Sequence, residues 1–265
     1  MSAASVDTLP YERSLRTPVG RAKELIRRLL ATSARPCGTL VRVATGEPAF
    51  ALTFDDGPDP DETPRALDVL AAHGARATFF MVGRRAETHP QLVASVAAAG
   101  HAIANHSWDH PSFPRLDRGE RESQLRRAAA ALAPHGVPLF RPPFGEQNLA
   151  SLLDARRAGF EIVGWDVSSE DWRDAPADHL VGRTLRRLRR GSIVLFHDSL
   201  YVTEDARYRD RAPMRAALAT LLARLAPTHR FVTVPELLRL GRPVYWHHYH
   251  RLPAAFHRSL GPPAG

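Results

Sequence analysis

Hydrophobic and polar positions alternate in blocks from residue 49 onward. Short apolar runs are separated by longer stretches in which apolar residues recur every three or four positions. Runs too short for a helix and bounded by turn residues are typical of buried strands. We therefore predict strands at residues 49–54, 77–82, 101–104, 137–140, 161–165, 192–196 and 230–234.

The stretches between these runs have the spacing of amphipathic helices. We predict helices at residues 63–73, 90–99, 118–133, 147–158, 177–189 and 214–225. Strands that alternate with helices form parallel βαβ units, so the fold class is α/β, either a barrel or a doubly wound sheet. We expect one domain over residues 49–240, an N-terminal extension over 1–48 and a C-terminal tail over 241–265 laid over that domain.

Charge and composition narrow the possible partners of this 265-residue chain. The net charge of +8 comes almost entirely from arginine, which favours anionic partners such as acidic glycans or phosphorylated sugar lipids. No known nucleic-acid-binding module is present, so we expect no nucleic acid. The single cysteine, Cys37, excludes an internal disulfide and a cysteine metal cage.

The sequence contains no apolar stretch of transmembrane length. Residues 1–17 lack the basic start and the apolar core of a signal peptide. We therefore expect a cytoplasmic protein with no transmembrane segment.

Residues able to do chemistry follow five of the predicted strands. They are Asp55 and Asp56, residues 105–110, Arg141, residues 166–172, and His197 with Asp198. In parallel α/β barrels the carboxyl ends of the strands meet at one face, where the active site lies. The sequence therefore predicts that these residues form one site.

Two histidines and a carboxylate indicate a metal. His106 and His110 are four residues apart, so on one helical turn, capped by Asn105, they would face the same way. With a carboxylate from the first strand end they suit a catalytic zinc with open positions. A non-haem iron oxygenase uses the same ligand types and stays a rival. The doubled aspartate favours hydrolysis, because hydrolysis needs a base beside the metal.

Two further pairs fit acid–base chemistry. The Arg141 guanidinium beside Asp55 would hold that carboxylate ionised and oriented. An acidic partner such as Asp171 would keep His197 protonated and make it a proton donor.

Five segments in this order resemble the motifs of the polysaccharide deacetylases, the NodB-homology or carbohydrate esterase family 4 proteins. They are TFDDGPD (53–59), HSWDH (106–110), RPPFG (141–145), SSEDW (168–172) and LFHD (195–198). The resemblance covers roughly residues 49–240. It implies a distorted (β/α)7-type barrel, one divalent metal, usually zinc, and hydrolysis of an N-acetyl group on an amino sugar or glycan, possibly carrier-linked.

The resemblance also implies a role for each matching residue. It implies that Asp55 is the base, positioned by Arg141, and that the metal ligands are Asp56, His106 and His110. It implies that His197 is the acid, held by Asp171, and that the Phe144 amide stabilises the oxyanion. It also implies that Trp172 and Leu195 form the walls of the acyl pocket. Phe144 stands where many members have Tyr. Ser168 stands where Asp is common, so a contact made there by other members is in doubt.

Substrate choice is left open by these motifs. Related sites also cleave O-acetyl esters and formamides. A family member that only binds glycans is disfavoured, because none of the base, metal-ligand or acid positions is substituted. The charged loop 199–213 is our candidate for selecting the substrate. Arg207, Arg209 or Arg211 could grip a carrier phosphate, or they could pair with Asp205 and Asp210 at the surface.

Overall fold

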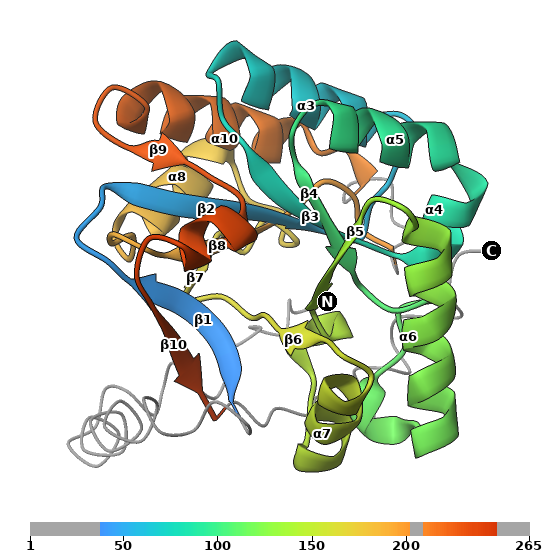
Figure 1. Ribbon diagram of the computed structural model, residues 1–265. Helices are drawn as coiled ribbons and strands as arrows, with labels where there is room; N and C mark the ends of the chain where they lie inside the picture. Colours follow the sequence, from blue (N-terminus) through green and yellow to red (C-terminus); the bar gives the residue numbers. More distant parts are fainter. Residues whose placement is uncertain (1–37, 202–208, 248–265) are drawn as a thin grey trace, which may run out of the picture.

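A parallel sheet that curls into a half-barrel is the centre of the molecule. The computed structural model describes residues 38–201 and 209–247 (Figure 1). The strand order is β6-β5-β4-β3-β2-β8-β7, with β9 paired to the start of β2, and all these pairs are parallel. The strands are β2 (Ala49–Asp55), β3 (Ala77–Met81), β4 (Ala102–Asn105), β5 (Gly136–Phe140), β6 (Glu161–Ile162), β7 (Val167–Ser168), β8 (Ile193–His197) and β9 (Arg230–Phe231). This is the predicted (β/α)7 type of barrel.

Helices follow most of the strands. They are α3 (Glu62–Ala72), α4 (Gly83–Thr88), α5 (Pro90–Ala98), α6 (Arg118–Leu132), α7 (Leu149–Arg157), α8 (Ala177–Leu185), α10 (Ala212–Leu225) and α11 (Val234–Leu238), with 3-10 turns at Phe113–Arg115 and Pro143–Gly145. Every strand and helix expected from the hydrophobic pattern is present. The prediction missed several elements of two to six residues, such as β7 and α4. A segment this short shows no periodicity of hydrophobic positions. In the described part of the chain, no helix combines the length and the apolar character needed to cross a bilayer.

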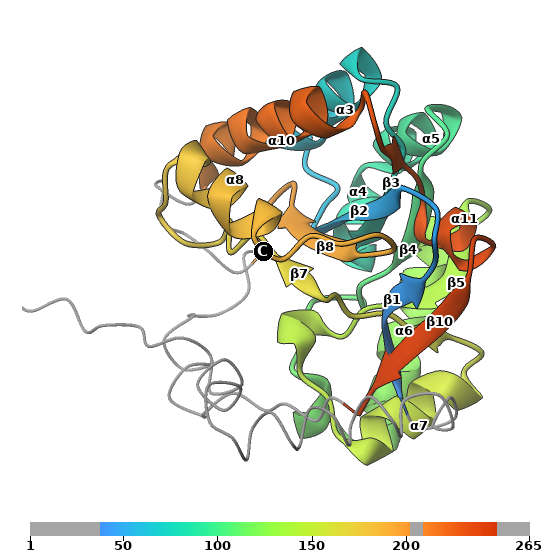
Figure 2. The ribbon, with the colours of Figure 1, turned by 90° about the vertical axis from the view of Figure 1, so that its left-hand side faces the viewer.

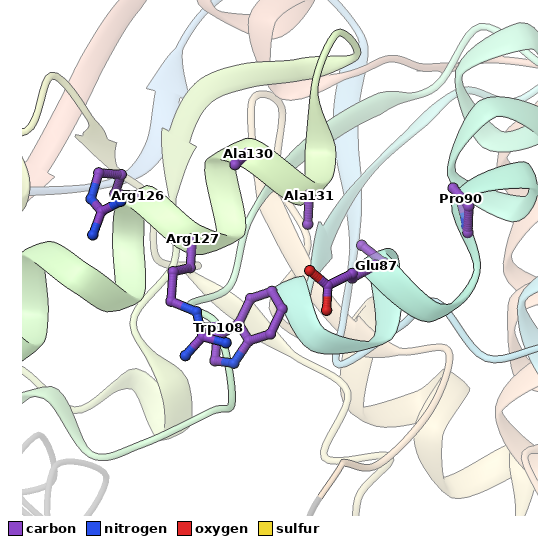
Figure 3. A pocket seen from close by; sticks show the side chains of 8 residues that line it. Glu87, Pro90, Trp108, Arg126, Arg127, Ala130 and Ala131 are labelled. Carbon is purple, nitrogen blue, oxygen red and sulfur yellow. The ribbon is translucent and has the colours of Figure 1, made fainter.

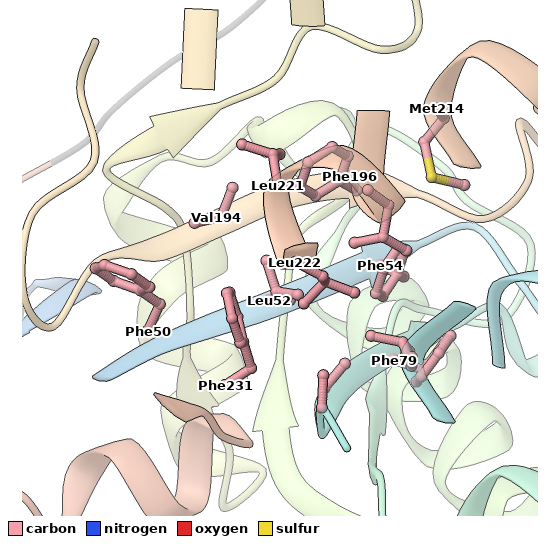
Figure 4. Close-up of a cluster of buried hydrophobic side chains, with 14 of the residues drawn as sticks. Phe50, Leu52, Phe54, Phe79, Val194, Phe196, Met214, Leu221, Leu222 and Phe231 are labelled. Atoms are coloured by element: carbon pink, nitrogen blue, oxygen red, sulfur yellow. The ribbon is translucent and has the colours of Figure 1, made fainter. Parts of the chain in front are cut away.

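Strand alternation divides the core into two sides. Phe50, Leu52 and Phe54 of β2 face outward into a cluster covered by α3, α8 and α10 (Figure 4). The Phe54 ring stacks on those of Phe79 and Phe196, at centroid distances of 5.0 and 5.9 Å. Ala51, Thr53 and Asp55 therefore face the concave side, because successive side chains point to opposite faces.

A small antiparallel pair of strands closes the concave side. β1 (Thr39–Ala44) pairs with β10 (Arg242–Trp246), and the two lie side by side in Figures 1 and 2. Bridges from Leu40 to Val163 and from Arg42 to Ser192 attach β1 between the two ends of the curled sheet. Leu40 and Val43 then join one core cluster with residues of β2, β3 and β8. Apolar groups thus fill this part of the concave side, and polar groups gather at the carboxyl ends.

β1 falls within the expected N-terminal extension and β10 within the expected tail. Both strands pack on the barrel, and the other parts of these two segments lie largely outside the described residues. The exact domain limits stay a prediction.

Candidate active site

The carboxyl ends of the strands gather the chemistry-bearing residues at one edge. Asp55 ends β2 and His197 ends β8, and these two residues are register partners in neighbouring strands. Asn105 ends β4, and Arg141 directly follows β5. Parallel pairing therefore brings together residues from distant parts of the sequence, as the strand-end pattern predicted.

Three buried donors converge at this edge. One oxygen of Asp56, Oδ1, lies 3.3 Å from Nε2 of His106 and 3.2 Å from Nε2 of His110. The ligand atoms of the three residues lie within 4.8 Å of one another. Two imidazole nitrogens and one carboxylate oxygen at this spacing are a donor set that fits a divalent metal with open coordination positions.

Hydrogen bonds orient two of the donors. Nδ1 of His106 lies 2.8 Å from the carbonyl oxygen of Arg141, a contact that places the ring proton on Nδ1 and the lone pair on Nε2. The backbone N–H of Tyr201 donates to Oδ2 of Asp56 at 2.9 Å, which leaves Oδ1 facing the histidines. No sequence pattern indicates this contact of Tyr201, because a backbone contact does not depend on residue type.

The protonation directions agree with a ligand role. Burial opposes ionisation of Asp56, but the charge and hydrogen bonds of His110 and His106 outweigh it and hold the pKa of Asp56 well below its usual value. Burial lowers the pKa of His110. An ionised carboxylate and a neutral imidazole are the forms that bind metal.

The segment carrying the two histidines is an irregular loop, so the expected helical turn was wrong. Ser107 and His110 have positive φ values of 68° and 60°. The Asn105 side chain accepts the N–H of Ser107 at 2.8 Å, and the Ser107 hydroxyl accepts the N–H of His110 at 3.0 Å. These local side-chain acceptors replace the helical ladder. The loop still turns both imidazoles toward Asp56.

The ring of His110 is oriented by packing. Its Nδ1 has no hydrogen-bond partner among residues 38–201 and 209–247. The ring of Phe144 meets it edge-on, with centroids 4.4 Å apart. Phe144 itself has a φ of 58°, in the turn that follows Arg141. The phenyl ring thus helps to fix a metal-type donor, a contact that the sequence did not reveal.

Next to the donor cluster, Arg141 holds Asp55. The guanidinium is fully buried and donates to Oδ1 of Asp55 at 2.6 Å and to Oγ1 of Thr53 at 2.8 Å. It also donates to the carbonyls of Val163 and Gly164, at 3.2 and 2.9 Å. The other oxygen, Oδ2, lies 3.8 Å from Nε2 of His106. Asp55 is therefore held through one oxygen and has the other near the donor cluster.

At the end of the neighbouring strand β8, Asp171 holds His197. Oδ1 of Asp171 lies 3.0 Å from Nδ1 of His197, and Oδ2 accepts the backbone N–H of His197 at 2.8 Å. Burial lowers the pKa of His197, but the charge and hydrogen bond of Asp171 outweigh it, so the pKa is raised. Burial raises the pKa of Asp171, and His197 and Arg211 outweigh it, so that pKa is lowered. The pair therefore favours a protonated imidazole.

The two residues expected to wall the acyl pocket lie next to this acid pair. The Trp172 ring meets the His197 ring edge-on at a centroid distance of 5.5 Å. Leu195 is buried two residues before His197 in β8 and so shares its face of the strand. The Ser168 hydroxyl accepts the backbone N–H of Glu170 at 3.2 Å, which is a local turn contact.

Arg211 occupies a position that neither sequence hypothesis described. It is buried, and its Nη2 donates to Oδ2 of Asp171 at 2.5 Å. Both the phosphate grip and the surface pairing are therefore wrong for Arg211. Arg209 is exposed, and Arg207 lies outside the described residues. The position of Arg211 directly before an apolar helix was the one available signal.

Asp198, next to His197, supports the turn after Asp56. It is buried and accepts a hydrogen bond from the Thr63 hydroxyl. A Cβ on Gly57 would come within 2.4 Å of its carboxylate, so only glycine fits there. Burial raises the pKa of Asp198 to about 7. The hydrogen bond connects the end of β8 to α3, which follows the loop that carries Asp56.

A separate hollow of about 410 Å³ lies between α4 and α6, beside Trp108 of the histidine loop (Figure 3). The Arg127 guanidinium covers the Trp108 ring there at 3.9 Å. None of the residues discussed above as base, acid or metal donor lines this hollow, so it is distinct from the site. Its lining residues are Ala86, Glu87, Pro90, Trp108, Arg126, Arg127, Ala130 and Ala131.

A parallel half-barrel with a His–His–Asp donor set at its strand ends, next to a buried aspartate and a half-buried histidine, defines a class of hydrolase folds. The sequence model of one family, described as polysaccharide deacetylase, matches residues 42–163. The chain belongs to the polysaccharide deacetylase family, and the resemblance expected from the five motifs is confirmed.

Relatives show the same relationship over most of the chain. The chitooligosaccharide deacetylase of Sinorhizobium fredii is 39% identical over 195 residues, covering 71% of this chain and 90% of the relative. A peptidoglycan-N-acetylglucosamine deacetylase of Bacillus cereus is 36% identical over 217 residues, covering 80% and 98%. The crystal structure of the Bc1960 peptidoglycan N-acetylglucosamine deacetylase superposes with a TM-score of 0.68 at 30% identity, covering 76% of this chain and 93% of that one. Enzymes with these names are hydrolases of carbon–nitrogen bonds.

Proposed function

We propose that this protein removes the N-acetyl group from N-acetylglucosamine residues of a glycan, of the chitooligosaccharide or peptidoglycan type. One observation carries the proposal. Asp55 and His197 end neighbouring strands beside the His–His–Asp cluster, and each is held by a buried partner. Amide hydrolysis needs a base for the attacking water and an acid for the leaving amine, and the site offers both.

Asp56, His106 and His110 would hold one divalent metal, and their nitrogen and oxygen donors suit zinc. When bound, the metal supplies a Lewis acid for the carbonyl oxygen and for the attacking water. The contacts of the neighbouring residues fit a metal at this position. His106 keeps its Nε2 lone pair available because its Nδ1–H donates to the backbone carbonyl of Arg141.

Asp55 accepts the proton of the attacking water in this proposal. The Arg141 guanidinium occupies Oδ1, so Oδ2 is the oxygen turned toward the donor cluster. The fixed guanidinium also orients this buried carboxylate. The water is thereby activated beside the carbonyl carbon.

His197 gives a proton to the departing amine. Asp171 binds Nδ1, which leaves Nε2 as the atom that can transfer the proton. The Phe144 amide would donate to the developing oxyanion, a role drawn from the family resemblance. Trp172 and Leu195, close to His197, would enclose the acetyl methyl group.

The test is acetate release from a panel of sugars. The panel holds N-acetylglucosamine oligomers, peptidoglycan fragments, a carrier-linked N-acetylated sugar, and O-acetylated and N-formylated analogues. We expect acetate from the N-acetylated glycans, loss of activity with a chelator, and recovery with added zinc. Release from the O-acetyl or N-formyl analogues alone would replace this proposal with an esterase or a deformylase. Dependence on iron and an oxo-acid would favour an oxygenase.

A further inference from the structure

Arg211 is the residue that makes the acid side of the site rigid. It lies directly before α10, and its side chain is 3% exposed. Three of its nitrogens donate hydrogen bonds, and every acceptor belongs to Asp171 or His197. Because all these hydrogen bonds go to two residues of the site, they indicate a role for Arg211 in the function of those residues.

The Asp171 carboxylate needs this partner. Oδ1 receives the Ser169 hydroxyl at 2.9 Å and faces Nδ1 of His197, while Oδ2 receives the backbone N–H of His197 and the guanidinium of Arg211. The carboxylate has no solvent exposure. A buried carboxylate that loses one of its positively charged partners tends to bind a proton or to move. Arg211 prevents both and so keeps Oδ1 directed at the imidazole.

The same guanidinium joins three elements. Nη1 donates to the carbonyl of Asp171 at 3.0 Å, and Nε and Nη2 donate to the carbonyl of His197 at 3.3 and 3.2 Å. These bonds connect the loop after β7, the end of β8 and the start of α10. Only a planar fork of donors can reach all these acceptors together, so lysine is not an equivalent.

We propose that Arg211 is a positioning residue that acts through Asp171 to orient His197 for proton transfer to the leaving amine. This inference rests on the proposed function, because it takes His197 as the general acid. It assigns a task to a residue outside the five motifs.

The first test compares two leaving groups. Arg211→Gln should lower kcat on an N-acetylglucosamine oligomer by about 10²-fold, at the lower end of acid–base effects. It should change the hydrolysis of 4-nitrophenyl acetate much less, because that phenolate leaves without a proton. Arg211→Lys should remain impaired on the amide. Arg224→Gln, an exposed arginine of the same helix, is the matched control. Equal losses on amide and ester would overturn the inference.

The second test uses the His197→Ala background. If Arg211 acts only through His197, adding Arg211→Gln there should cause no further loss, because residues that act as a unit are not additive. A multiplied loss in the double variant would show an independent role and overturn the inference.

A third readout does not depend on the substrate. In proton NMR the Nδ1–H of His197 should give a low-field signal, assigned by its absence in His197→Ala. Arg211→Gln should abolish or shift that signal, and Arg224→Gln should leave it in place. An unchanged signal in Arg211→Gln would overturn the positioning role. A wild-type protein that releases no acetate but shows this pattern would refute the proposed function alone.

Discussion

The proposed base and the proposed acid each depend on a buried arginine–aspartate pair, but the two pairs act in different ways. Arg141 binds Asp55 at 2.6 Å, and Arg211 binds Asp171 at 2.5 Å. Arg141 also donates to two consecutive carbonyls, those of Val163 and Gly164. Arg211 donates to two carbonyls from separate segments, those of Asp171 and His197. On the Asp55 side the arginine touches the proposed base itself, whereas on the His197 side it reaches the proposed acid through an aspartate.

The difference follows from the chemistry of the two groups. A carboxylate base must stay ionised, so a direct guanidinium contact helps it. An imidazolium acid is positively charged, so a direct guanidinium contact would destabilise its protonated form. An aspartate between the two cations instead gives each of them a favourable charge contact. The comparison teaches that an arginine can support either kind of group. It contacts a negatively charged base directly, and it reaches a positively charged acid through one intervening carboxylate.

The largest expected effect is on the base side. Asp55→Asn should lower kcat by about 10² to 10⁴-fold, the range of a general base, while bound metal is retained. The loss should be similar for an amide and for an activated ester, because both need the attacking water. Steady-state kinetics with metal analysis checks this. Exposed Asp61 provides the control Asp61→Asn, which should stay active. Near-normal turnover of Asp55→Asn would place the base elsewhere.

Stability should reveal how deeply the base-side pair is buried. Arg141→Met leaves the Asp55 carboxylate without its partner and should lower the free energy of unfolding by about 3–5 kcal/mol. Chemical denaturation measures the change. Arg224→Met, at an exposed site, should stay within about 0.5 kcal/mol of the parent protein. If the two variants unfold alike, the ion pair contributes nothing beyond a surface contact.

The acid side should appear in the pH profile. His197 must be protonated to act, and Asp171 raises its pKa, so amide turnover should persist below that pKa and fall as the pH rises through it. Asp171→Asn removes the raising charge and should move this high-pH limb to lower pH. The profile of kcat against pH tests this, with exposed Asp178→Asn as the control. A limb that does not move would assign it to another group.

The smallest expected effect concerns Phe144. Its proposed contribution to the chemistry is a backbone amide, and its ring packs on His110. Phe144→Tyr keeps the ring and the backbone, so kcat/KM should change by less than about threefold, well under the effect of losing an oxyanion donor. Phe144→Ala removes the ring and should weaken metal affinity, measured by competition with a chelator. Equal metal affinity in both variants would show that the ring does not orient His110.

Much of this site could be predicted because its residues stand at the ends of apolar strands. Asp55, Arg141 and His197 each follow such a run, and parallel pairing then places them together. The loop after β4 could not be predicted, since Asn105 and Ser107 fit a helix cap as well as the loop contacts they make. Arg211 was misjudged because the charged residues around it suggest a surface loop.

The sequence by itself determined the local features: the alternation of strands and helices, the side chains at strand ends and the family motifs. These depend on periodicity and on neighbouring residues, which a sequence displays directly. The tertiary structure alone decided which arginine meets which carboxylate, because Asp55 and Arg141 are 86 residues apart and Asp171 and Arg211 are 40 apart. It also decided that β1 and β10 close the concave side. Such contacts depend on burial and on the path of the chain, which no local pattern records.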